Sequence, residues 1–176
     1  MKRLQELDLR NTRVSDEGLV HLKDLESLTR LDLSNTKVTG HGLRHLAQLP
    51  KLGIVKLENC PITNDGLEAI TAWASAPLLN LSGTKITDKA IGHLARCNSW
   101  GFLDLSKTGI TNAGLDALAG MDKLTALYLN DTAIDDDGLA KLARVKSLKW
   151  LQCYRSGVTE EGKARLRKAA PNLIVQ

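Results

Sequence analysis

The stretch from Leu28 to Leu46 reads LTRLDLSNTKVTGHGLRHL and contains two patterns that decide the fold. Leu31 and Leu33 alternate with polar residues, which is the two-residue period of a half-buried strand. Further along the stretch, Leu43 and Leu46 lie one helical turn apart. The stretch therefore predicts a short strand followed by a short helix.

The same pattern recurs every 24 residues without an insertion or a deletion. With the first residue of each unit counted as repeat position 0, seven units begin at Leu4, Leu28, Leu52, Ala76, Trp100, Leu124 and Leu148. Apolar residues are expected at positions 0, 3, 5, 10, 15, 18 and 21, and only Lys163 departs from this rule. Such a period indicates a solenoid in which each unit packs against its neighbours. We expect a single domain over residues 1–176, with a closing segment at 169–176.

Small polar residues mark the predicted start of each helix. Position 11 holds residues that can cap a helix N-terminus: Ser15, Thr39, Thr63, Thr87, Thr111, Asp135 and Thr159. Position 12 often adds an acid or an amide, and a carboxylate there interacts favourably with the helix dipole. Position 14 is glycine in six units and Ala90 in the fourth, which predicts close packing between neighbouring helices.

The repeat L-x-x-L-x-L-x-x-T-x-[VI]-T-x-x-G-L-x-x-L resembles the leucine-rich repeat, and the resemblance covers nearly the whole chain. Its glycine-leucine helix start is similar to the ribonuclease-inhibitor-like and cysteine-containing branches and to bacterial repeat proteins. The resemblance implies an α/β arc with a parallel sheet on its concave side and short helices outside. It also implies that the small polar residues at position 8 form a buried ladder to the loop backbone of adjacent units.

The units differ from one another at positions 2, 4 and 6, which this fold turns toward solvent on the concave side. Six residues of the chain are Phe, Tyr or Trp, and four of them fall at these positions: Phe102, Tyr128, Trp150 and Tyr154. The other two, Trp73 and Trp100, occupy core positions. Clustered exposed aromatics are typical of an interaction site. Packing of apolar residues along the sheet and self-association are the two other interpretations.

The composition argues against several function classes. A net charge of +4 is spread along the chain, and the expected concave surface has no positive track for phosphates, so we expect neither nucleic-acid nor membrane binding. Three cysteines at different repeat positions disfavour disulfides. His41 and His45 lie at metal-ligand spacing, and Asp135–Asp137 is an acidic run, but neither completes a metal site. We expect no cofactor and no enzymatic activity.

The absence of a leader or a membrane-length apolar run favours a cytoplasmic protein, with delivery as a secreted effector left open. The sequence predicts a module that binds a protein or peptide on its concave face. It could also be the recognition segment of a larger ubiquitin-ligase-like adaptor, enzyme or bacterial effector, or a homodimer that associates through the concave face or its uncapped first unit. The expected contact residues are Ile54, Leu78, Asn80, Phe102, Asp104, Tyr128, Trp150, Gln152 and Tyr154. The expected rim consists of Glu6, Asp8, Arg10, Arg30 and Asp32.

Overall fold

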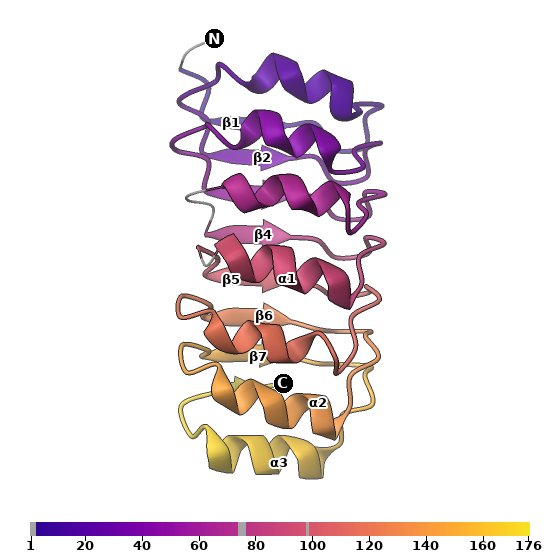
Figure 1. Cartoon of the computed structure of the whole chain (residues 1–176), viewed down its shortest axis with the longest axis vertical. Helices are drawn as coiled ribbons and strands as arrows, with labels where there is room; N and C mark the ends of the chain where they lie inside the picture. Colours follow the sequence, from indigo (N-terminus) through magenta and orange to yellow (C-terminus); the bar gives the residue numbers. More distant parts are fainter. Residues whose placement is uncertain (1–2, 74–76, 98) are drawn as a thin grey trace.

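The computed structural model describes residues 3–73, 77–97 and 99–176, and it stacks the repeats into one parallel sheet covered on one face by helices (Figure 1). Ala76, the expected start of the fourth unit, lies outside the described residues. The eight strands pair in sequence order, from β1 to β8. They are β1 (Glu6–Asp8), β2 (Arg30–Asp32), β3 (Ile54–Lys56), β4 (Leu78–Asn80), β5 (Phe102–Asp104), β6 (Ala126–Tyr128), β7 (Trp150–Gln152) and β8 (Ile174–Val175). The predicted leucine-rich repeat solenoid is confirmed.

Helical segments connect successive strands, and many of them are 3₁₀ rather than α. The 3₁₀ segments are η1 (Asp16–Leu22), η2 (His41–Leu46), η3 (Gly66–Ala72), η4 (Leu115–Gly120) and η5 (Leu142–Arg144). The α-helices are α1 (Asp88–Cys97), α2 (Asp136–Lys141) and α3 (Glu160–Ala169). A 3₁₀ helix rises about 2.0 Å per residue, against about 1.5 Å in an α-helix, so it spans the layer with fewer residues.

The core lies between the sheet and the helices, where the apolar repeat positions were expected. Leu31, Leu33 and Leu43 are fully buried, and so is Trp100. Trp73 packs beside it, with 6.2 Å between the ring centroids. Lys163 is the exception in the pattern. Its Nζ lies 2.9 Å from Glu160 and 6.0 Å from the centroid of the Tyr154 ring.

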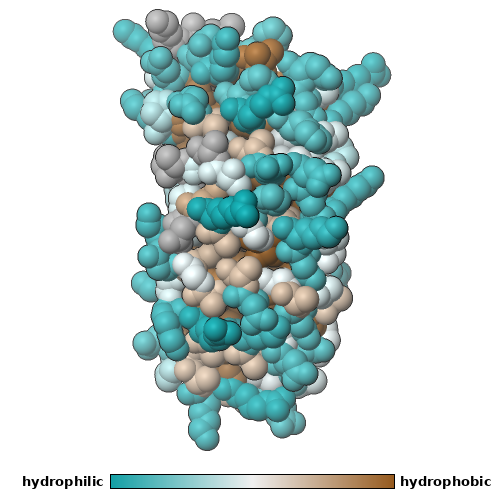
Figure 2. All heavy atoms as spheres, viewed as in Figure 1, coloured by the Kyte–Doolittle hydropathy of each residue, from teal (hydrophilic) through white to brown (hydrophobic). Residues whose placement is uncertain are grey.

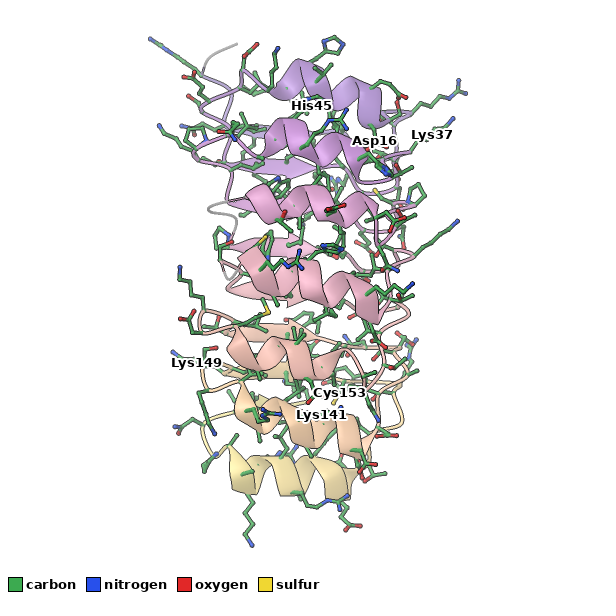
Figure 3. The ribbon with its side chains drawn as sticks, viewed as in Figure 1. Asp16, Lys37, His45, Lys141, Lys149 and Cys153 are labelled. Carbon is green, nitrogen blue, oxygen red and sulfur yellow. The ribbon has the colours of Figure 1, made fainter. Side chains whose placement is uncertain are left out.

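A set of polar side chains at position 12, here called the stacking ladder, joins one turn to the next at five junctions along the edge where strands lead into helices; the second turn has Gly40 there instead. The Asp16 carboxylate accepts the hydroxyl of Thr39 at 2.6 Å and its backbone N–H at 3.0 Å. Asp136 makes the equivalent bonds to Thr159, at 2.7 and 2.8 Å. Figure 3 shows Asp16 at this edge, beside the first two turns.

The ladder corrects the expected roles of positions 11 and 12. The hydroxyl of Thr159 and the carboxylate of Asp135 do accept N–H groups of their own helices, as predicted. Ser15 makes no such capping bond. The acids and amides at position 12 bond to the following turn, because the 24-residue repeat places each directly beside position 11 of its neighbour.

The glycine at position 14 leaves room for this ladder. A Cβ on Gly42 would lie 2.6 Å from the Asp16 carbonyl oxygen, and one on Gly114 would lie 2.5 Å from Asp88 Oδ1. At Gly66 the obstruction is the backbone carbonyl of Thr39. The expected close packing is therefore present, and from the second turn on it brings these glycines against the preceding turn.

The prediction of a buried ladder at position 8 is largely wrong. The hydroxyls of Thr84, Thr108 and Thr132 donate to a carbonyl three residues earlier in their own turn, at 2.5–2.7 Å. Cys60 does reach the preceding turn, where its Sγ donates to the Leu33 carbonyl at 3.0 Å and lies 3.4 Å from the Thr36 hydroxyl. At these positions the nearest carbonyl is the one three residues earlier in the same turn, so the hydroxyl bonds within its own loop.

The helical face is polar at its margins and apolar along its middle (Figure 2). His45 lies on this face, near the viewer in Figure 3. The histidines at position 17 are not uniformly solvated: His21 is exposed, whereas His93 is half-buried and its Nδ1 has no hydrogen-bond partner among the described residues. His45 is half-buried as well.

Candidate protein-binding face

The sheet face turned away from the helices, here called the open sheet face, carries one continuous apolar row. In-register pairing places residues at repeat position 2 side by side across six strands. This apolar row consists of Ile54, Leu78, Phe102, Ala126, Trp150 and Ile174. The first five are partly exposed, and Ile174 is 52% exposed. Because each strand contributes one side chain, neighbouring members contact one another and still present a surface to solvent.

Phe102, in the middle of the row, packs against Tyr128, which lies beside the row at repeat position 4. The rings of Phe102 and Tyr128 meet edge to face, with centroids 4.9 Å apart and planes at 73°. This geometry suits the ring quadrupoles and holds both side chains in place. On the next strand, the Nε1 of Trp150 is buried and makes no hydrogen bond to any described residue. The row is therefore a rigid, partly exposed aromatic surface that retains one unused donor.

Amide side chains connect the last turns beside the row. Asn130 Nδ2 donates to Gln152 Oε1 at 3.2 Å, and Gln152 Nε2 donates to Gln176 Oε1 at 3.2 Å. The Tyr154 hydroxyl donates to the same Gln176 oxygen at 3.2 Å. The Tyr154 backbone N–H donates to Asn130 Oδ1 at 2.9 Å. This network fixes Gln152 and Tyr154, the latter 49% exposed.

Some predicted contact residues are less free than expected. Asn80 Oδ1 accepts the N–H of Ser82 at 2.8 Å, and Asp104 Oδ1 accepts that of Ser106 at 3.0 Å. The expected exposure of position 6 is wrong for the serines, since Ser34, Ser82 and Ser106 are buried. A serine side chain is short, so it stays close to the backbone.

The expected rim at the first strands is an ion-pair cluster around a hollow of about 330 Å³, lined by Glu6, Leu7, Asp8, Arg10, Arg30 and Asp32. Arg10 contacts Asp8 at 2.7 Å and Asp32 at 3.7 Å, while Lys56 reaches Asp32 at 4.0 Å. Hydrogen bonds from the Arg10 side chain lower the pKa of Asp8 to about 2. The carboxylates of Asp8 and Asp32 are thus paired with cations.

Sequence reasoning missed two members of the open sheet face, Ile174 and Gln176. Both belong to the closing segment, where Ile174 pairs with Trp150 and Gln176 bonds to Gln152 and Tyr154. The signal was present, because continuing the 24-residue count to an eighth unit places them at positions 2 and 4.

Other chemistry in the described part of the chain is limited. No group of three or more His, Cys, Asp or Glu residues gathers there in a way that could hold a metal ion. Burial raises the pKa of the Cys97 thiol to about 11 and also raises the pKa of Cys60 and Cys153. These thiols are protonated near neutral pH and are poor nucleophiles.

Comparison with known sequences agrees with this geometry. The family described as Leucine Rich repeat matches residues 3–23, 24–47, 48–70, 102–119 and 122–143, together more than half of the chain. The chain belongs to the leucine-rich repeat family. Proteins of this family generally bind other proteins, and the fold is generally not catalytic. A search of curated proteins found no match.

Two solved structures of Listeria monocytogenes internalins are similar to this leucine-rich repeat chain. Internalin C2 (inlC2) is 29% identical with a TM-score of 0.77, and the match covers 97% of this chain and 69% of that one. The internalin inlF is 16% identical with a TM-score of 0.50, and the match covers 99% of this chain and 61% of that one. The second likeness concerns the fold alone. None of the helices among the described residues has the length and apolarity that a bilayer span requires.

Proposed function

We propose that this chain is a non-enzymatic recognition module that holds a protein or peptide partner on its open sheet face, the concave side of the arc. The apolar row is the observation that carries the proposal. It places Phe102 and Trp150 on β5 and β7, and Tyr128 lies beside the row on β6; all three are partly exposed, and the rings of Phe102 and Tyr128 hold each other. Aromatic anchors of this kind commonly dominate the energy of protein interfaces.

The mechanism is preorganisation. Tyr128 is held by the ring of Phe102, and Gln152 is held between Asn130 and Gln176. A partner therefore orders few side chains when it binds, and less of the contact energy is lost as conformational entropy. The apolar row supplies the buried area, while Asn80, Asp104 and Gln152 set the polar contacts at its border.

The partner should match the division of this face into two parts. Around the last four strands the face is apolar and amide-rich, whereas the first strands carry the Arg10, Asp8 and Asp32 ion pairs. We expect an apolar segment of the partner to lie over Phe102 and Trp150. Charged residues of the partner would lie toward the first strands, where they affect association rate more than affinity.

Affinity capture with single substitutions tests the proposal. Phe102→Ala and Trp150→Ala each remove an anchor, and we expect each to weaken partner capture by about 30-fold, the equivalent of a hot spot of about 2 kcal/mol. Lys89→Ala, on the exposed helical face, is the matched control and should capture the partner as the parent chain does. Unchanged capture by both aromatic variants, with native circular dichroism, would reject the open sheet face as the binding site.

One alternative is that the chain is the recognition segment of a larger protein, such as an adaptor, an enzyme or a bacterial effector. The similar internalin chains are longer than the part matched here, which favours this alternative. Self-association through the apolar row is the other. Light scattering that shows a monomer at all concentrations would remove it.

A further inference from the structure

The first turn, residues 4–27, has an apolar face that points away from the second turn. This first-turn face includes side chains that are only partly buried: Leu4, Leu7, Leu9, Val14, Leu22 and Leu25. The residues one repeat later are almost completely buried: Leu28, Leu31, Leu33, Val38, Leu46 and Leu49. The difference shows how much of each turn a preceding turn covers.

The sheet is also open at this end. Within the described part of the chain β1 pairs only with β2, so its outer edge faces away from the sheet. In the later turns that edge is used: the N–H groups of Gly53 and Ile54, for example, both donate to the Thr29 carbonyl, at 2.9 and 3.0 Å. β1 thus presents backbone groups in the arrangement that joins every other pair of strands.

Ser15 occupies repeat position 11, where later turns bond to the position-12 side chain of the turn before. In five of the later turns, the equivalent N–H donates to an Asp or Asn side chain one turn earlier, at 2.8–3.1 Å, from Thr39, Thr87, Thr111, Asp135 and Thr159. Ser15 has no such acceptor among the described residues, and its hydroxyl donates to Glu17 instead. Among the described residues, the Ser15 N–H therefore remains available to bond to a side chain of one further turn.

Gly18 gives an independent sign of the same interface. A Cβ there would meet only Val14 Cγ1, at 3.4 Å, which is ordinary contact. At Gly42 and Gly114, by contrast, the preceding turn's Asp occupies that space. Glycine costs about 1 kcal/mol relative to alanine within a helix, and nothing in the first turn itself requires it.

We propose that the first-turn face receives one further strand-helix turn of the same repeat, stacked in line with the solenoid and carrying Asp or Asn at its position 12. Its strand pairs in parallel with β1, and its leucines cover Leu4, Leu7 and Leu9. Its Asp or Asn accepts the N–H of Ser15 and fills the space beside Gly18. The contact continues the interface that already joins each pair of turns, and it involves no residue of the apolar row.

A second copy of this chain does not offer the required turn. Its last turn has Glu160 at position 12, which contacts Lys163 at 2.9 Å and Arg167 at 4.0 Å. β8 also follows that turn and takes the place of a next strand. If two copies met through their first-turn faces, the two Ser15 N–H groups would find no carboxylate acceptor, because Asp16 already accepts the Thr39 hydroxyl.

An extended chain tests the proposal. A copy of residues 124–147, which carries Asp136 at position 12, is joined directly in front of Leu4 of the full chain. The matched control has the same extension with Asp136→Ala in the added copy only. Amide exchange of Ser15 is measured in both chains by NMR, and urea unfolding is measured in both chains and in the unextended chain, each with and without Gly18→Ala.

We expect the Ser15 N–H to exchange about tenfold more slowly with the Asp extension than with the Ala extension. Gly18→Ala should lower the urea midpoint only in the chain with the Asp extension, and should maintain or raise it in the unextended chain. Equal Ser15 exchange in the two extended chains, or the same effect of Gly18→Ala in all three, overturns the proposal. Protection of Ser15 that grows with the concentration of the unextended chain also overturns it, since a second copy would then be the occupant.

Discussion

Gly66 shows how closely two turns approach, because any Cβ there would overlap the backbone carbonyl of Thr39. A backbone carbonyl cannot swing aside as a side chain can, so the two turns must separate. We expect Gly66→Ala to lower the free energy of unfolding by about 1–3 kcal/mol, as overpacked cores do. Urea unfolding followed by circular dichroism measures the change.

Gly92 is the matched control, since nothing lies within 4 Å of the Cβ that alanine would add there. It lies inside α1 and is exposed. Gly92→Ala should therefore raise the free energy of unfolding by about 0.5–1 kcal/mol through helix propensity. A similar loss in both variants would contradict close approach at Gly66 and point to a general sensitivity of the helices.

Asp136 makes the ladder depend on pH. Hydrogen bonds from the backbone and hydroxyl of Thr159 place its pKa below the ordinary 3.8. Its contribution to stability is thus complete above about pH 4 and is lost as the pH falls through the lower pKa of the folded state. Asn64 bonds to Thr87 in the same place, so Asp136→Asn should fold normally at neutral pH.

Urea midpoints of the parent chain and of Asp136→Asn, measured from about pH 7 down to about pH 2, check this expectation. Below about pH 4 the parent should lose stability relative to the variant, because only the parent has a carboxylate to protonate at this position. Two curves that stay parallel over the whole range would mean that the Thr159 bonds do not favour the ionised form.

At the scale of elements, the sequence was sufficient for the order and position of the strands. Leu103 and its flanking residues alternate as a half-buried strand must, and the structure has a strand there. It was not sufficient for the stacking ladder. Asn112 and Asp135 are 23 residues apart, and only the stacked turns bring Asn112 Nδ2 to 2.6 Å from Asp135 Oδ1. Helix type also escaped prediction, because the 3₁₀ geometry follows from the span to be covered.

For the candidate site, the sequence predicted which residues lie in the row but not the bonds of their polar neighbours. Repeat position 2 identified the apolar row from Ile54 to Trp150, because in-register pairing preserves repeat position. It could not show that Asn80 and Asp104 bond to serines two residues on, since such bonds depend on side-chain rotamers. Neither the repeat pattern nor the structure identifies the partner, because binding is set by the variable surface and not by the fold.

The closing segment, which contains β8, should contribute to stability and to binding through different residues. Leu173 is 5% exposed and belongs to the core, whereas Ile174 is 52% exposed on the apolar row. We expect Leu173→Ala to cost about 2–4 kcal/mol of unfolding free energy and Ile174→Ala less than about 1 kcal/mol. Urea unfolding distinguishes them, and an equal cost for both would show that β8 is not docked as described.

The whole molecule should be least stable at its first turn. In a solenoid each turn contacts only its neighbours, so local stability follows how completely both sides of a turn are covered. β1 has a neighbour on one side among the described residues, and Leu4, Leu7 and Leu9 remain partly exposed. β7, in contrast, is covered by β8, with Cys153 N–H donating to Gln176 at 3.0 Å.

Native-state hydrogen exchange tests this asymmetry across the molecule. Amides that bind between β1 and β2, such as Leu9 N–H to the Asp32 carbonyl at 2.8 Å, should open with a smaller free energy than those between β5 and β6, such as Leu105 N–H to the Tyr128 carbonyl at 2.9 Å. The difference should persist in Phe102→Ala, because the apolar row does not touch the first turn. Equal opening free energies at both sites would mean that the solenoid unfolds as a single cooperative unit, and the first turn would then need no further cover to be as stable as the rest.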